Sequence, residues 1–178
     1  MESGPTALPT ARLQVTEMVI GPERVVRERQ PNDPPCRNLA IFSLEGELFF
    51  GAAPLLGECL DMLRQRVKQG ARVLILRLKR TRNPDMVCLE MLQQFLEEMQ
   101  DRKVPVLLCG IRPDFEQALR NLRFHHWLPQ DYVFLEDVTM GSSTLKAVRR
   151  AYELLGDDLC DACPRRDSSD KHNWYYMI

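Results

Sequence analysis

RVLILRLKRTRNPDMVCLEMLQQF, the stretch from Arg72 to Phe95, decides the fold. It opens on a short, unbroken apolar run at Val73–Leu76, which is typical of a central strand covered on both faces. A charged loop over Lys79–Arg82 follows, with Arg77 standing just before it. The stretch therefore predicts a buried strand that leads through a polar turn into a helix.

The helix start is predicted from three consecutive residues. Asn83 has the side chain of an N-cap, and Pro84 suits the first helical position. Asp85 places a carboxylate in the first turn, where the helix dipole favours it. Open α/β sheets usually bind their ligands at strand-to-helix junctions of this kind, so we interpret this junction as the functional edge.

The rest of the chain alternates strands with helices. Apolar runs predict strands at 38–50, 104–109 and 133–134, and apolar spacings of three and four residues predict helices at 54–69, 84–102, 113–122 and 142–155. Glu45-Gly46 is expected to interrupt the first of these strands as a bulge or bend. The alternation predicts an α/β fold with a mainly parallel sheet of four to five strands and four to five helices.

Three segments differ in composition. Residues 1–37 are rich in proline and hold either a hairpin that adds to the sheet, from 13–20 and 23–29, or a plain linker. Residues 38–156 form the predicted domain. Residues 157–178 are a charged tail that ends in an apolar cluster, which is expected to dock on the domain or on a partner.

Composition excludes several classes of function. A formal net charge of −1 gives no electrostatic case for nucleic-acid binding. No apolar run approaches the roughly 18 to 20 residues of a membrane span, and no signal peptide is evident. Six cysteines in a chain with a sizeable core do not suggest a disulfide framework, so we expect a cytoplasmic protein.

No catalytic constellation is apparent. The single glycine at the junction after the first domain strand matches neither the dinucleotide nor the phosphate-loop pattern, and no nucleophile elbow exists. His125 and His126 are interpreted as exposed polar residues. Cys88 lies near a helix start, where the dipole lowers a thiol pKa, but it falls on an apolar stripe, which favours core packing. We predict no enzyme and no cofactor.

Cys160 and Cys163 have the spacing of metal ligands, and His172 lies further along the tail. A structural zinc site usually has four ligands, and these are three at most, so the pair is a weak metal candidate. Disulfide or metal bonding between two chains is the other role left open.

Residues 41–53, IFSLEGELFFGAA, resemble the opening of the STAS domain (sulfate transporter and anti-sigma factor antagonist). The likeness is greatest to the domain at the cytoplasmic C-terminus of SulP-type anion permeases. It extends over about residues 38–156, through VLILRL at 73–78, GIRP at 110–113 and VFLED at 133–137. It implies a STAS-like (SpoIIAA-like) fold and a non-enzymatic role in regulation and assembly.

The resemblance also implies that the strand-to-helix junction lacks the phosphorylatable residue of anti-sigma factor antagonists. Anti-sigma factor antagonists carry Asp-Ser-Ser/Thr-Gly at this place, and a kinase phosphorylates the hydroxyl. The matching residues here are Asp85-Met86-Val87-Cys88, and neither Met86 nor Val87 can accept a phosphoryl group. No phosphorylation is therefore predicted at the family position, which favours the transporter branch.

Three functional hypotheses follow. The first is a regulatory domain of a SulP-type sulfate or anion transporter that docks on the membrane domain or on another STAS domain, including a second copy of itself. Its predicted docking residues are Arg80, Arg82, Asn83, Pro84, Asp85, Met86 and Val87, with the loops near Gly46 and Gly110. The second is a free-standing partner-switch protein like an anti-sigma factor antagonist, phosphorylated at Thr81. The third is an enzyme that uses Cys88 or Cys163.

Overall fold

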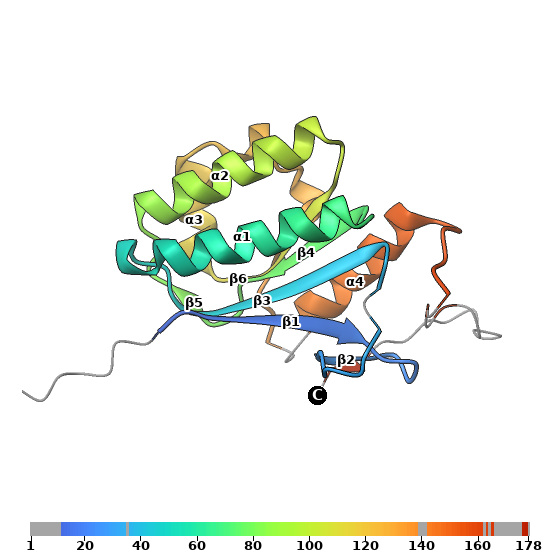
Figure 1. The fold of residues 1–178 in the computed structure, drawn as a ribbon. Coiled ribbons are helices and arrows are strands. Elements are labelled where there is room, and N and C mark those ends of the chain that lie inside the picture. Colours follow the sequence, from blue (N-terminus) through green and yellow to red (C-terminus); the bar gives the residue numbers. More distant parts are fainter. Residues whose placement is uncertain are drawn as a thin grey trace, which may run out of the picture.

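The computed structural model describes residues 12–34, 36–138, 142–161, 163, 165 and 176–177 (Figure 1). The strands are β1 (Gln14–Ile20), β2 (Val25–Glu28), β3 (Leu39–Glu47), β4 (Val73–Arg77), β5 (Thr81–Arg82), β6 (Val106–Ile111), β7 (Val133–Leu135) and β8 (Tyr176–Met177). The helices are α1 (Ala53–Lys68), α2 (Met86–Asp101), α3 (Pro113–Asn121) and α4 (Ser142–Leu155), with short 3-10 helices η1 (Phe50–Ala52), η2 (Phe124–His126) and η3 (Gln130–Tyr132). The predicted alternation of strands and helices is confirmed.

The sheet is mixed, and its parallel part is the one predicted from the sequence. Its strands lie in the order β7-β6-β4-β3-β1-β2-β8, and β5 pairs with β3 beside this path. Strands β3, β4, β6 and β7 pair in parallel. The β1–β2 hairpin adds antiparallel pairing to β3, and β8 pairs in parallel with β2. The sheet is thus larger than the four to five strands predicted, because both ends of the chain contribute to it.

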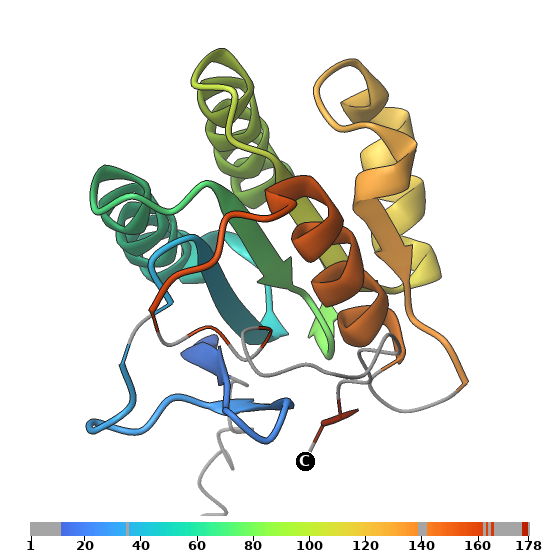
Figure 2. The same cartoon turned by 90° about the vertical axis from the view of Figure 1, so that its right-hand side faces the viewer.

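Helices cover both faces of the sheet. Figures 1 and 2 show α1, α2 and α3 together on one face and α4 on the other. Alternate residues of β4 point to the two faces: Leu74 and Leu76 pack in the core beneath α1–α3, whereas Val73 and Ile75 pack against α4. Burial on both faces explains why this strand is an unbroken apolar run, as predicted.

Strand β3 corrects one detail of the prediction. The expected bend at Glu45-Gly46 is present, but it does not end the strand, because β3 continues to Glu47. Gly46 has φ +121 and pairs with Thr81 of β5, so the bend is absorbed within the strand. A Cβ at Gly46 would lie 3.0 Å from the carbonyl oxygen of Arg12, which explains the glycine.

Candidate functional site

The loop between β4 and α2 is held rigidly against the end of β3. Thr81 is fully buried, and its hydroxyl donates a hydrogen bond of 2.9 Å to the carbonyl oxygen of Leu44. The Leu48 amide donates to the Arg82 carbonyl at 3.0 Å, and the Asp85 amide donates to the Leu48 carbonyl at 2.9 Å. Backbone and side-chain bonds therefore fix the loop on which the predicted docking residues lie.

Helix α2 begins two residues later than the sequence predicted. Asp85, not Asn83, is the N-cap: its backbone is extended and its carboxylate accepts a 3.0 Å hydrogen bond from the Cys88 amide. Asn83 instead has φ +49, a left-handed conformation that asparagine tolerates better than most residues. The Asn83–Pro84 pair thus belongs to the turn, because the Asp85 amide that follows it is hydrogen-bonded to the Leu48 carbonyl and the helix starts only after this bond.

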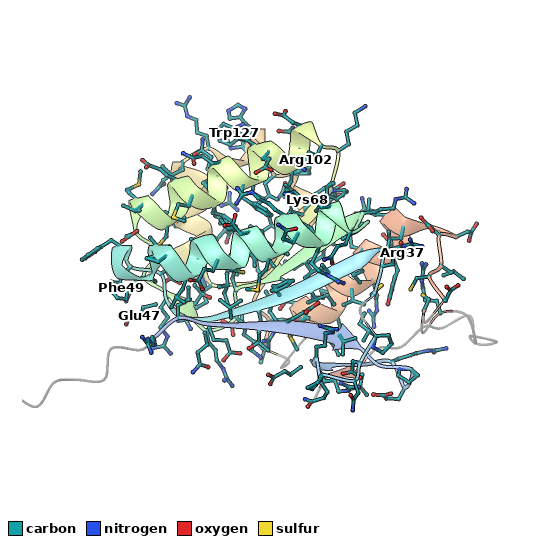
Figure 3. All side chains as sticks on the ribbon, in the orientation of Figure 1. Arg37, Glu47, Phe49, Lys68, Arg102 and Trp127 are labelled. Carbon is teal, nitrogen blue, oxygen red and sulfur yellow. The ribbon has the colours of Figure 1, made fainter. Side chains whose placement is uncertain are left out.

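Three apolar side chains are exposed together at this helix start. Met86 and Val87 in the first turn of α2 are 52% and 47% exposed, and Phe50 of η1 is 73% exposed. The Cys88 thiol donates to the Phe49 carbonyl oxygen at 3.4 Å, which ties η1 to the first turn of α2. We call Phe50, Arg80, Arg82, Met86 and Val87 the α2-start surface. Figure 3 shows Glu47 and Phe49 at the same end of the molecule, beside the beginning of α1.

Phe50 is the member of this surface that sequence reasoning missed. The signal was available in the Phe49-Phe50 pair, because two adjacent side chains at the end of a strand cannot both point into the core. Phe49 packs against the core, and its ring contacts Phe50 edge-on at a centroid distance of 5.7 Å. The second aromatic ring is left in solvent.

The α2-start surface includes two arginines, and acidic side chains adjoin them. Arg80 and Arg82 are exposed, and a guanidinium nitrogen of Arg80 lies 3.5 Å from a Glu45 carboxylate oxygen. Arg82 makes no ion pair with any described residue. Exposed pairs of this kind contribute at most about 1 kcal/mol, so they leave the surface free to exchange partners. An apolar centre with a charged rim is the arrangement found in protein–protein contacts.

Arg77 does not belong to this surface. It is only 9% exposed and lies on the α4 face of the sheet, beside Ser43 and Cys109 of the neighbouring strands. Its guanidinium donates to the Ser43 hydroxyl at 2.9 Å and to the Thr144 hydroxyl at 3.2 Å. The Glu45 carboxylate, 3.4 Å from the guanidinium, compensates the charge, and the hydroxyls satisfy its other donors. Arg77 therefore joins α4 to the sheet, and Glu45 links it to Arg80.

The predicted chemical candidates have structural or surface positions. Cys88 is buried, as expected, and burial raises the pKa of its thiol to about 11. Cys163 is also buried, which makes it a poor nucleophile for an external substrate. His125 and His126 are exposed on η2. No cluster of three or more metal-ligating side chains occurs among the described residues, and His172 lies outside them.

The fold and the surface together define a class: a small α/β domain that presents a helix start with its adjoining loops. The chain belongs to the STAS domain family, whose model matches residues 28–136. This confirms the resemblance and the STAS-like fold. STAS domains are generally regulatory and non-catalytic.

Solved structures include similar proteins. A sulfate transporter family protein from Wolinella succinogenes is 26% identical, with a TM-score of 0.54 over 70% of this chain and 92% of that one. The murine Solute Carrier 26 family member A9 anion transporter shares the fold, with a TM-score of 0.57 at 13% identity over 81% of this chain. The match spans 23% of that transporter. An anti-sigma factor antagonist from Mycobacterium paratuberculosis aligns with 20% identity and a TM-score of 0.47, over 65% of this chain and 90% of that one. No curated protein matches this chain.

No described helix combines the length and the apolar character that crossing a membrane requires.

Proposed function

We propose that this chain is a non-enzymatic regulatory domain of a SulP-type sulfate or anion transporter system. It docks at the cytoplasmic face of the membrane, on the membrane domain of the transporter or on another STAS domain. The observation that carries the proposal is the α2-start surface, in which Phe50, Met86 and Val87 are exposed on a rigid support. The likeness to the Wolinella succinogenes protein supports the transporter context.

The rigid support favours binding without rearrangement. Because Thr81, Leu48 and Asp85 anchor the loop by hydrogen bonds, a partner would not have to order it. Preorganised surfaces lose less conformational entropy on association. The three apolar side chains would form the buried centre of the contact, and Arg80 and Arg82 would select an acidic rim on the partner.

The partner-switch alternative is less well supported. Its family position holds Met86 and Val87, and the nearest hydroxyl, that of Thr81, is buried and already donates to Leu44. A kinase could reach the Thr81 hydroxyl only if the loop first broke its hydrogen bonds to Leu44 and Leu48. The same burial removes any easy route to a covalent switch at the α2-start surface.

Binding to a membrane domain tests the proposal. The probe is a detergent-solubilised SulP-type membrane domain expressed without its own STAS domain, titrated with the full chain. We expect Met86→Gln, and separately the double change Arg80→Glu with Arg82→Glu, to weaken binding by about tenfold or more, since central apolar side chains often contribute over 1 kcal/mol.

Met62→Gln is the matched control. Met62 lies on α1 and is 41% exposed, so it resembles Met86 in type and exposure but lies outside the α2-start surface. The affinity of the Met62→Gln variant for the membrane domain should stay within about twofold of the wild-type value, as expected for a surface change outside the contact. The proposal fails if the wild-type chain does not bind, or if Met86→Gln and the charge-reversed variant bind as tightly as Met62→Gln.

A further inference from the structure

The chain that follows α4 folds back against the residues that precede β3. The side-chain amide of Asn38 donates to the Asp158 carbonyl oxygen at 3.1 Å, and the Arg72 guanidinium pairs with the Asp158 carboxylate. Arg165 donates to the Gly156 carbonyl at 2.8 Å and lies over the Tyr152 ring, 4.4 Å from its centroid. Figure 2 shows this segment running from the end of α4 toward the β3 side of the sheet.

Two cysteines meet at this contact. The sulfur atoms of Cys36 and Cys160 are 3.8 Å apart, although the residues are separated by 124 positions in the chain. Both side chains are half-buried. Figure 3 shows the neighbouring Arg37 at the same end of the molecule, beside the end of α4. The sequence suggested Cys160 and Cys163 as the pair, because only they are close in sequence; the fold brings Cys160 to Cys36 instead.

We propose that Cys36 and Cys160 form a reversible disulfide that fastens the C-terminal segment to the domain. A disulfide has an S–S bond of about 2.05 Å, so the sulfurs must approach by about 1.8 Å from their present 3.8 Å. Asn38 and Arg72 already hold Asp158, two residues before Cys160, in place. These contacts hold the two segments together before oxidation, so the sulfur atoms have only a short distance left to close.

The oxidant in this proposal is a small disulfide such as oxidised glutathione. The Cys160 thiolate attacks one of its sulfurs, forming a mixed disulfide and releasing the first glutathione thiolate, which takes up a proton. The Cys36 thiolate then attacks the Cys160 sulfur and displaces the second glutathione thiolate. The two protein sulfurs are oxidised by two electrons in total, the glutathione disulfide is reduced by two, and the two protons of the protein thiols pass to glutathione.

The surroundings of Cys36 affect the second step of this exchange. Burial, followed by the nearby Cys160 sulfur, raises the pKa of the Cys36 thiol to about 11. Little Cys36 thiolate is present at neutral pH, so closure of the mixed disulfide by Cys36 should become faster as the pH rises above about 7. In a reducing cytoplasm the pair would stay as thiols and close only under oxidising conditions.

The test uses the full chain in buffers of reduced and oxidised glutathione, followed by alkylation and non-reducing trypsin digestion. Trypsin should release Cys36 in the peptide 30–37 and Cys160 with Cys163 in the peptide 151–165. We expect these two peptides to be linked, and the link to be lost in Cys36→Ser. In Cys163→Ser it should persist, which assigns the bond to Cys160.

A stability measurement adds a second readout. The new bond closes a loop of more than a hundred residues, so the oxidised chain should melt at least about 5 °C above the reduced chain, and Cys36→Ser should show no such difference. A link between Cys160 and Cys163, a predominant link between two chains, the absence of any link, or a linked chain with an unchanged melting temperature would each overturn the proposal. None of these outcomes bears on docking through the α2-start surface.

Discussion

Gly110 should be among the least replaceable positions of this domain, and its substitution by alanine tests how the loop is supported. Gly110 lies in β6 with φ +73, a left-handed conformation. A Cβ placed there would lie 2.8 Å from the amide nitrogen of Lys79 and 2.9 Å from its Cα. These are backbone atoms, and the neighbouring Leu78 amide is bonded to the Cys109 carbonyl at 2.8 Å, so they cannot move aside independently.

The magnitude follows from two contributions. Left-handed φ costs an alanine about 1–2 kcal/mol, and forcing an extra methyl group into a closely packed place costs about 1–3 kcal/mol. Gly110→Ala should therefore lower the free energy of unfolding by about 3 kcal/mol. Lys79 leads directly to Arg80, so the same change should also displace the α2-start surface and weaken docking.

Gly156→Ala is the matched control. Gly156 ends α4 with φ +57, but a Cβ there would meet nothing within 4 Å. Its substitution should cost only the conformational part, about 1 kcal/mol, and the loss of unfolded-state entropy is the same for both glycines. Urea unfolding of the two variants should thus differ by about 2 kcal/mol. Given the uncertainty of such measurements, a difference below about 0.5 kcal/mol would refute the reasoning that the backbone of Lys79 leaves no space for a Cβ at position 110.

Two other predictions concern buried polar groups. Thr81→Val removes the hydrogen bond to Leu44 and should destabilise the domain by about 1–2 kcal/mol in the same urea assay, while mass spectrometry of the folded wild-type chain after kinase treatment should find no phosphate at Thr81. Phosphate there would revive the partner-switch alternative. Burial raises the pKa of Cys88 to about 11 and of Cys109 to about 12, above the ordinary value near 9, so the folded state holds these protons more tightly than the unfolded state. Stability should therefore be intact below pH 9 and fall as pH rises toward 12, and Cys109→Ala should fall less steeply; an unchanged slope would contradict this reasoning.

The main elements could be predicted because their patterns are local. The run at Val73–Leu76 and the three- and four-residue spacing of apolar residues in α1 and α2 depend only on burial of one strand or one helix face. The start of α2 was predicted two residues too early because Asn83 and Pro84 have the chemistry of a helix start. The position of the helix start is decided by the hydrogen bond from the Asp85 amide to the carbonyl of Leu48, a residue 37 positions earlier.

The candidate site was predicted only in part for the same reason. Met86 and Val87 are exposed in the first turn of α2, and Phe50 joins them through the tertiary contact between η1 and α2. In the sequence, Arg77 adjoins the charged loop. In the structure, the alternation of side chains along β4 directs it to the face of the sheet that α4 covers. The approach of Cys36 to Cys160 depends on two distant segments and has no local signal in the sequence.

The order of the strands also governs how this protein can associate. The two outermost strands, β7 and β8, have three and two residues, whereas the nine-residue β3 is enclosed between β4 and β1. Unpaired backbone groups on a long outer strand are a template for sheet extension by another chain, and short outer strands offer few such groups. Among the described residues, the outermost strands therefore offer little backbone for pairing with another copy of the chain. Association would then occur through surfaces of side chains, and the residue types on those surfaces can distinguish one partner from another.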